Sequence, residues 1–173
     1  MNKVVAIISG DPNSINSEII AKTWKNKKKF KGINLFIIGN YNLIKKQISK
    51  IGYKIKLKKI NYINHRDLKK NLCIYDVPLK FKSIFNVSSE KKSKYLKESF
   101  KIALNFIKTK HIIGLINCAI NKRDINSGSK FTGITEFLAK KTAVSGKEVM
   151  LIYNKKLSVS PITTHIKLSQ VSK

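Results

Sequence analysis

The stretch "KVVAIISGDPNSINSEII" (3–20) contains the pattern that most clearly indicates the fold class. Its first part, 3–9, is a β-rich apolar run that ends in a "GDPNS" turn. The spacing of the apolar residues after the turn predicts a helix. The apolar face of this helix comprises Ile15, Ile19, Ile20 and Trp24. A strand, a turn and a helix in this order form the unit from which α/β proteins are built.

Strand and helix patterns continue to alternate along the chain. Further strands are predicted at 33–39, 53–60, around 72–78, 112–117, 148–153 and 156–163. Further helices are predicted at 42–52, 89–109 and 135–143. The unbroken apolar run "IIGLIN" (112–117) indicates a sheet covered on both faces. We therefore expect a mainly parallel sheet flanked by helices, in a single α/β region that spans residues 1–173.

The helix predicted at 89–109 has the clearest two-sided pattern. Its apolar stripe comprises Leu96, Phe100, Ala103, Leu104 and Ile107. Lysines occupy the opposite face, where water is expected to surround them, and Ser88 is the expected N-cap.

The composition fits a folded protein outside the membrane. A chain of 173 residues with 42% hydrophobic residues can form one domain with a core. No apolar run is long enough to span a membrane or to form the core of a signal peptide, so we expect a cytoplasmic protein. Cys73 and Cys118 stand far apart beside apolar residues, and we expect both to be buried thiols.

The charge is unusually high, at +27, with 36 Lys and Arg against 9 Asp and Glu. Such a charge is typical of proteins with polyanionic partners. However, only Arg66 and Arg123 are arginines, the lysines are spread along the chain, and aromatic residues do not obviously interleave with them. We therefore expect loose, salt-sensitive polyanion binding, and keep a basic, non-catalytic nucleic-acid-binding module as an alternative function.

Chemically useful side chains follow the predicted strands, where α/β sheets bind their ligands. The loops concerned are "SGDPNS", "NCAINKRD", "FTGITE" and "TTHIK". Asn121 and Lys122 could meet a phosphate or carboxylate, although Lys122 could equally be a solvated lysine. Thr135 lies near a helix start, where it could meet an anion or act as an ordinary N-cap. A lone histidine such as His165 more often bonds a carbonyl than a metal.

The order and spacing of these loops resemble the 4-hydroxythreonine-4-phosphate dehydrogenase family of vitamin B6 biosynthesis. The first family turn reads "GDPNSINSE" here, and the second strand and helix read "LFIIGNYNLI". The three later motifs read "AINK" (119–122), "FTGITEFLA" (131–139) and "TTHIKLS" (163–169). The resemblance spans the whole chain but only the N-terminal part of the family's longer chain, and the C-terminal nucleotide-binding part is absent.

The resemblance implies an architecture like that of isocitrate and isopropylmalate dehydrogenases, with two α/β lobes around a cleft and a homodimer. In the family, three histidines hold a divalent metal: zinc, magnesium, manganese or cobalt. His165 matches the first of them, whereas His65 and His111 match no family motif. No cofactor-binding residue is expected in this chain.

The implied reaction oxidises a secondary alcohol with NAD or NADP, and the resulting keto acid loses carbon dioxide. The metal would polarise the alcohol oxygen. By the same match, Thr135 would hold the phosphorylated substrate, with Asn121 and Lys122 beside it. We expect these 173 residues alone not to catalyse the reaction, because one matched ligand is too few for a catalytic metal.

Several positions depart from the family pattern. The substrate-contacting histidine of the family is Ile134 here, and isoleucine can neither donate nor accept a hydrogen bond. Glycines of the first loop are replaced by Ser14 and Asn16. These changes leave open a second possibility, a related dehydrogenase of another phosphorylated hydroxy acid.

Overall fold

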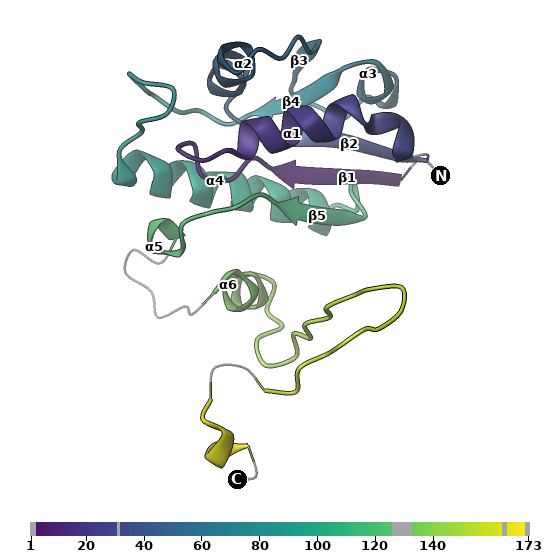
Figure 1. The fold of residues 1–173 in the computed structure, drawn as a ribbon, viewed down its shortest axis with the longest axis vertical. Helices are drawn as coiled ribbons and strands as arrows, with labels where there is room; N and C mark the ends of the chain where they lie inside the picture. The colour runs from purple at the N-terminus through teal and green to yellow at the C-terminus, as the bar shows by residue number, and fades with distance from the viewer. Residues whose placement is uncertain (1–2, 31, 126–132, 164–165, 172–173) are drawn as a thin grey trace. The chain divides into compact units, whose positions relative to one another are not determined.

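A computed structural model describes residues 3–30, 32–125, 133–163 and 166–171 of the chain (Figure 1). The contacts divide the chain into two compact units, Met1–Lys130 and Phe131–Lys173. The first unit contains the sheet and most of the helices. The prediction that all 173 residues form one α/β region stays a prediction.

The first unit is built on a five-stranded sheet in the order β3-β4-β2-β1-β5. The strands are β1 (Lys3–Ile8), β2 (Ile33–Gly39), β3 (Leu57–Ile60), β4 (Leu72–Asp76) and β5 (Gly114–Asn117). Each of the four strand pairings is parallel. The predicted α/β class with a mainly parallel sheet is confirmed.

Helices cover both faces of this sheet (Figure 1). The helices of the first unit are α1 (Asn16–Lys25), α2 (Tyr41–Lys50), α3 (His65–Lys70), α4 (Ser89–Lys108) and the short α5 (Lys122–Ile125). On one face, Ile20 of α1 and Ile44 of α2 belong to the same buried cluster as Ile37 of β2. On the other face, Phe106 of α4 meets the rings of Phe36 and Tyr75 edge to face.

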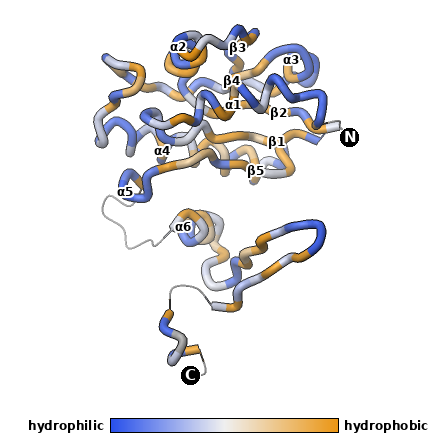
Figure 2. The backbone as a smooth tube through the Cα atoms, in the orientation of Figure 1, coloured by the Kyte–Doolittle hydropathy of each residue, from blue (hydrophilic) through white to orange (hydrophobic). Residues whose placement is uncertain are grey.

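The most hydrophobic residues of the first unit lie mainly in the strands of the sheet, between the two layers of helices (Figure 2). The central strands β1 and β2 are mostly apolar, with Lys3 and Asn34 as polar exceptions near their starts, which is typical of parallel strands that helices cover on both faces. Side chains alternate between the faces, so that Ile7 and Ile37 belong to the α1–α2 cluster while Phe36 packs on α4.

Three details of the first unit differ from the sequence-based predictions. Helix α1 is rotated from its predicted apolar face, since Ile15 and Ile19 are 68% and 46% exposed while Ile20 and Ala21 are buried. Strand β5 is half-exposed to exposed along its length, because it is an edge strand of the sheet. Helix α3 was not predicted, because its six residues bury a single apolar side chain, that of Leu68.

The second unit contains helix α6 (Ile134–Lys141) and a 3-10 turn, η2 (Leu168–Gln170). The predicted strands at 148–153 and 156–163 are wrong: one antiparallel bridge, Ile152 to Val159, is the pairing found between them among the described residues. Their apolar side chains are mostly exposed, and a two-stranded pairing alone is at best marginally stable in water. Within the described residues, no helix is long and apolar enough to cross a membrane.

Candidate functional site

The loops after β1 and β5 lie side by side at the carboxyl edge of the sheet, because these two parallel strands are neighbours. The backbone N–H of Asp11 donates to the carbonyl oxygen of Ala119 at 3.0 Å. The side-chain amide of Asn16 donates to the same oxygen at 2.7 Å. The "GDPNS" loop and the "AINK" loop are therefore fastened to each other.

Gly10 allows this close approach. Its φ of +74° is in the left-handed region that favours glycine. A Cβ at this position would lie 2.5 Å from the carbonyl oxygen of Ala119 and would collide with the side-chain amide of Asn16. Asn16 thus occupies the space beside Gly10 and holds the neighbouring loop.

Lys92 of α4 forms a buried ion-pair cluster beneath the two loops. Its ammonium lies 2.8 Å from Oδ2 of Asp124 and 3.4 Å from Oδ2 of Asp11. The hydroxyl of Ser89 donates to Oδ1 of Asp124 at 2.7 Å. The side chains of Lys92 and Asp124 are only 11% and 3% exposed. This cluster connects α4 with α5 and with the loop after β1.

Electrostatics favour the charged form of Lys92. Burial lowers the pKa of its ammonium, but the hydrogen bond to Asp124 and the charges of Asp11 and Asp124 together outweigh burial and raise the pKa above its ordinary value. A buried ammonium between two carboxylates satisfies the requirement that a buried charge be paired. Lys92 is therefore a structural cation and is not poised to accept a proton.

Tyr95 connects the ends of β1 and β2, one turn further along α4. Its hydroxyl lies 2.6 Å from the hydroxyl of Ser9 and accepts the backbone N–H of Asn40 at 3.0 Å. Burial is the main reason that the pKa of this phenol is raised. The side chain of Asn40 in turn accepts from Leu43 N and caps α2.

Asn121 and Lys122, both predicted substrate-binding residues, follow β5 at this edge and are exposed. The side-chain oxygen of Asn121 accepts the backbone N–H of Arg123 at 3.0 Å, where α5 begins. The ion pair between Lys92 and Asp124 holds α5 in place, and it thereby also fixes the turn that carries Asn121 and Lys122. The structure thus brings Asn121 and Lys122 to the same edge as Asp11.

The remaining predicted site residues belong to the second unit. Ile134 and Thr135 are the first two residues of α6, and both are half-buried. Gly133 is the N-cap of this helix, so Thr135 is not an ordinary N-cap. His165 lies outside the described residues.

No group of three or more His, Cys, Asp or Glu side chains among the described residues could hold a metal ion. The described part of the chain therefore does not by itself fit a divalent metal. The metal assignment of His165 stays a prediction.

The two cysteines are free thiols. Cys73 is buried in β4 and Cys118 is half-buried at the end of β5. Burial raises the pKa of each thiol to about 11. Neither is therefore a reactive thiolate at neutral pH. The prediction of a buried thiol is confirmed for Cys73, whereas Cys118 is only half-buried.

Sequence reasoning missed Lys92 and Asp124. Lys92 was grouped with the solvated lysines of α4, but it stands four residues before Leu96 and eight before Phe100, on the apolar stripe. A lysine on that stripe needs a buried partner, and this spacing could have identified it. The partner, thirty-two positions away at Asp124, could not be identified without the fold.

Residues 31–173 match the family model described as "Pyridoxal phosphate biosynthetic protein PdxA". The chain is 34% identical to the 4-hydroxythreonine-4-phosphate dehydrogenase of Sulfurihydrogenibium sp., over 96% of this chain and 51% of that protein. It is 26% identical to the putative D-threonate 4-phosphate dehydrogenase of Bradyrhizobium diazoefficiens, over 98% of this chain and 50% of that protein.

The fold is also similar to a solved structure. The crystal structure of a 4-hydroxythreonine-4-phosphate dehydrogenase from Burkholderia phymatum superposes with a TM-score of 0.84, at 22% identity, over 96% of this chain and 51% of that chain. The chain thus spans about half the length of the relatives that it matches. These matches confirm the resemblance drawn from the five sequence motifs.

Proposed function

Because the chain belongs to the pyridoxal phosphate biosynthetic protein PdxA family, we propose that it forms the N-terminal, substrate-binding half of a 4-hydroxythreonine-4-phosphate dehydrogenase. Such an enzyme would oxidise and decarboxylate its substrate in the pathway to pyridoxal phosphate. The proposal concerns the role of this chain within the whole catalytic unit, since the chain spans about half of its relatives.

One observation carries the proposal. The two loops that match family motifs, "GDPNS" and "AINK", are joined by the hydrogen bond from Asp11 N to Ala119 O and by the shared ion pairs of Lys92. They meet at the carboxyl edge of a parallel sheet, where α/β proteins bind ligands. A fixed pair of loops can hold a small substrate in one orientation, which lowers the entropic part of the barrier.

The side chains suggest a division of roles. Lys122 is exposed, and its ammonium would attract the phosphate or carboxylate of the substrate. The amide of Asn121 would contribute a hydrogen bond beside it. Thr135, at the first turn of α6, would hold the substrate with its hydroxyl.

Cofactor, metal and assembly are part of the same proposal. His165 would provide one ligand of a divalent metal such as zinc, magnesium, manganese or cobalt, with further ligands from outside this chain. NAD or NADP would accept the hydride and would bind outside this chain. The assembled enzyme would be a cytoplasmic homodimer.

A second candidate substrate is another phosphorylated hydroxy acid, such as D-threonate 4-phosphate. Ile134 favours it, since this residue stands where the family has a substrate-contacting histidine and offers no hydrogen bond. One relative of the chain has this substrate in its name. A substrate that lacks the group contacted by the family's histidine would lose no hydrogen bond when isoleucine stands at position 134.

Calorimetric titration of the purified chain with each phosphorylated acid tests the proposal. We expect saturable binding that Lys122→Ala weakens and that Lys94→Ala, a change at an exposed lysine of α4, leaves unchanged. Equal affinity of both variants would contradict the assigned role of Lys122.

Absorbance of the reduced nucleotide, with NAD and divalent metal added, tests competence. We expect no turnover by the chain alone. Turnover that disappears in His165→Ala would show that the metal site is completed within this chain or its oligomer.

A further inference from the structure

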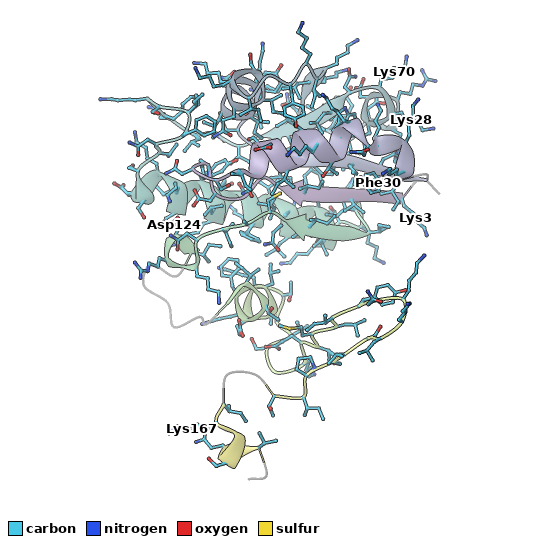
Figure 3. All side chains as sticks on the ribbon, in the orientation of Figure 1. Lys3, Lys28, Phe30, Lys70, Asp124 and Lys167 are labelled. Carbon is cyan, nitrogen blue, oxygen red and sulfur yellow. The ribbon has the colours of Figure 1, made fainter. Side chains whose placement is uncertain are left out.

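A hollow of about 370 Å³ lies at the end of the sheet opposite to the candidate site. It is bordered by the end of α1, the turn η1 (Lys27–Lys29), the start of β2 and helix α3. Figure 3 labels Lys28 and Phe30 at this end of the sheet, where β1 begins, and Asp124 at the other end. The residues of the hollow therefore do not belong to the substrate loops.

The hollow combines positive charge with aromatic rings. Lys27, Lys28 and Lys69 line it together with Trp24 and Phe30. The ammonium of Lys27 lies 4.4 Å from the centre of the Trp24 ring and donates to the carbonyl of Lys69 at 3.2 Å. This bond joins η1 to α3 across the hollow and fixes one ammonium beside an aromatic face.

No described carboxylate lines the hollow, so its charge is uncompensated. Acidic side chains elsewhere are used in pairs: Asp67 of α3, for example, meets Lys58 of β3 at 2.7 Å. None of the ion pairs found among the described residues involves Lys27, Lys28 or Lys69. A ligand with several negative charges would supply the missing counter-charge.

The exposed ring of Phe30 would distinguish between such ligands, because only some of them carry a base that can stack on it. Phe30 is 39% exposed at the border of the hollow, next to the exposed Lys28 and Lys29. A ring available for stacking beside lysine ammonium groups is the arrangement with which proteins bind single strands, one base on the ring and the phosphates on the cations. Lysine ammonium groups that contact phosphates carry no information about the bases, so the expected binding is independent of base sequence.

We propose that this hollow, which we call the amino-edge site and define by Trp24, Lys27, Lys28, Phe30 and Lys69, binds single-stranded nucleic acid. The proposal does not depend on the dehydrogenase function, because the site lies at the opposite edge of the sheet. It also differs from the diffuse attraction of a chain with a charge of +27, because it assigns binding to particular residues.

The only tryptophan of the chain, Trp24, lies in the site and reports on it directly. Titration of the full chain with oligothymidylate is expected to change the Trp24 fluorescence in a saturable way. Lys27→Ala/Lys28→Ala should reduce the slope of log affinity against log salt concentration by about 1.4. Each lysine that no longer neutralises a phosphate of the single strand accounts for about 0.7 of this change. The matched control is Lys80→Ala/Lys82→Ala, which removes two exposed lysines after β4.

Inorganic polyphosphate separates base stacking from charge. Phe30→Ala should weaken oligothymidylate binding at least fivefold and leave polyphosphate binding unchanged, because polyphosphate has no base to stack. Circular dichroism of each variant verifies that the fold is retained. Equal effects of the two lysine pairs, or an identical affinity of Phe30→Ala and the unaltered chain for oligothymidylate, would overturn the proposal and leave only diffuse charge attraction.

Discussion

Replacement of Lys92 by methionine tests whether the buried cluster holds the candidate site together. The change keeps most of the side-chain volume but removes the ammonium that lies 2.8 Å from Asp124 and 3.4 Å from Asp11. Asp124, only 3% exposed, would then be a buried carboxylate with no cation beside it. Removing one partner of a buried ion pair usually costs about 3–5 kcal/mol.

We expect a value near the lower end, about 3 kcal/mol, because two features soften the loss. The hydroxyl of Ser89 still donates to Asp124 at 2.7 Å. Asp11, at 14% side-chain exposure, retains some contact with water. The double variant Lys92→Met/Asp124→Leu removes the unpaired charge as well, and it should recover most of the lost stability.

Urea unfolding followed by Trp24 fluorescence measures the free energy of unfolding of the first unit. The control on the same helix is Lys94→Met, which removes an exposed pair with Glu90 and should cost far less than Lys92→Met, because water screens both charges. The pKa of Lys92 is raised, so its stabilisation is complete below the ordinary lysine value of 10.5 and is lost as the pH rises through the higher folded value. A cost at Lys92 equal to that at Lys94, or a double variant no more stable than the single one, would show that the buried cluster does not stabilise the first unit.

Three further changes test other contacts. Gly10→Ala should lower the free energy of unfolding in urea by about 2 kcal/mol or more, because it adds a collision with Ala119 O to the strain of a positive φ. The control is Gly52→Ala, which has a φ of +80° but open space around it and should cost only about 1 kcal/mol. Tyr95→Phe should lower the free energy of unfolding by about 1–3 kcal/mol, because it leaves the buried N–H of Asn40 without its acceptor. The same change at the exposed Tyr62 should not change the free energy of unfolding measurably. Alkylation of Cys73 and Cys118, followed by mass spectrometry, should rise about tenfold per pH unit up to about pH 11, where both thiols ionise; a plateau near pH 9 would contradict the burial of the thiols.

The fold was largely predictable because its signals are local. Apolar runs of strand length, each followed by a turn and a helical pattern, predicted the central strands and helices α1, α2, α4 and α6. The same rule failed at 148–163, where the structure shows one bridge in place of two strands and leaves the apolar side chains mostly exposed. The rule also predicted that β5 is buried on both faces, whereas the strand is half-exposed to exposed. An apolar sequence allows a strand to be buried, but the neighbouring elements decide whether it is.

The candidate site was predictable only in part, for a physical reason. Motif spacing located Asn121 and Lys122 after a strand, and the parallel pairing of β1 with β5 brought them to Asp11. The pairing of Lys92 with Asp124 is a contact between distant parts of the chain. In a chain with 36 basic residues, one buried lysine is hidden among many exposed ones until a structure reveals its partner.

The first half of α4 has a consequence for the motions of the carboxyl edge. Ser89, Lys92 and Tyr95 stand three residues apart and contact α5, the loop after β1 and the end of β2 in turn. Surface loops usually open independently and exchange their amide hydrogens quickly. Here each loop would have to break a contact with the same helix to open, so these loops should open and close together with α4, as one cooperative unit with a shared exchange rate.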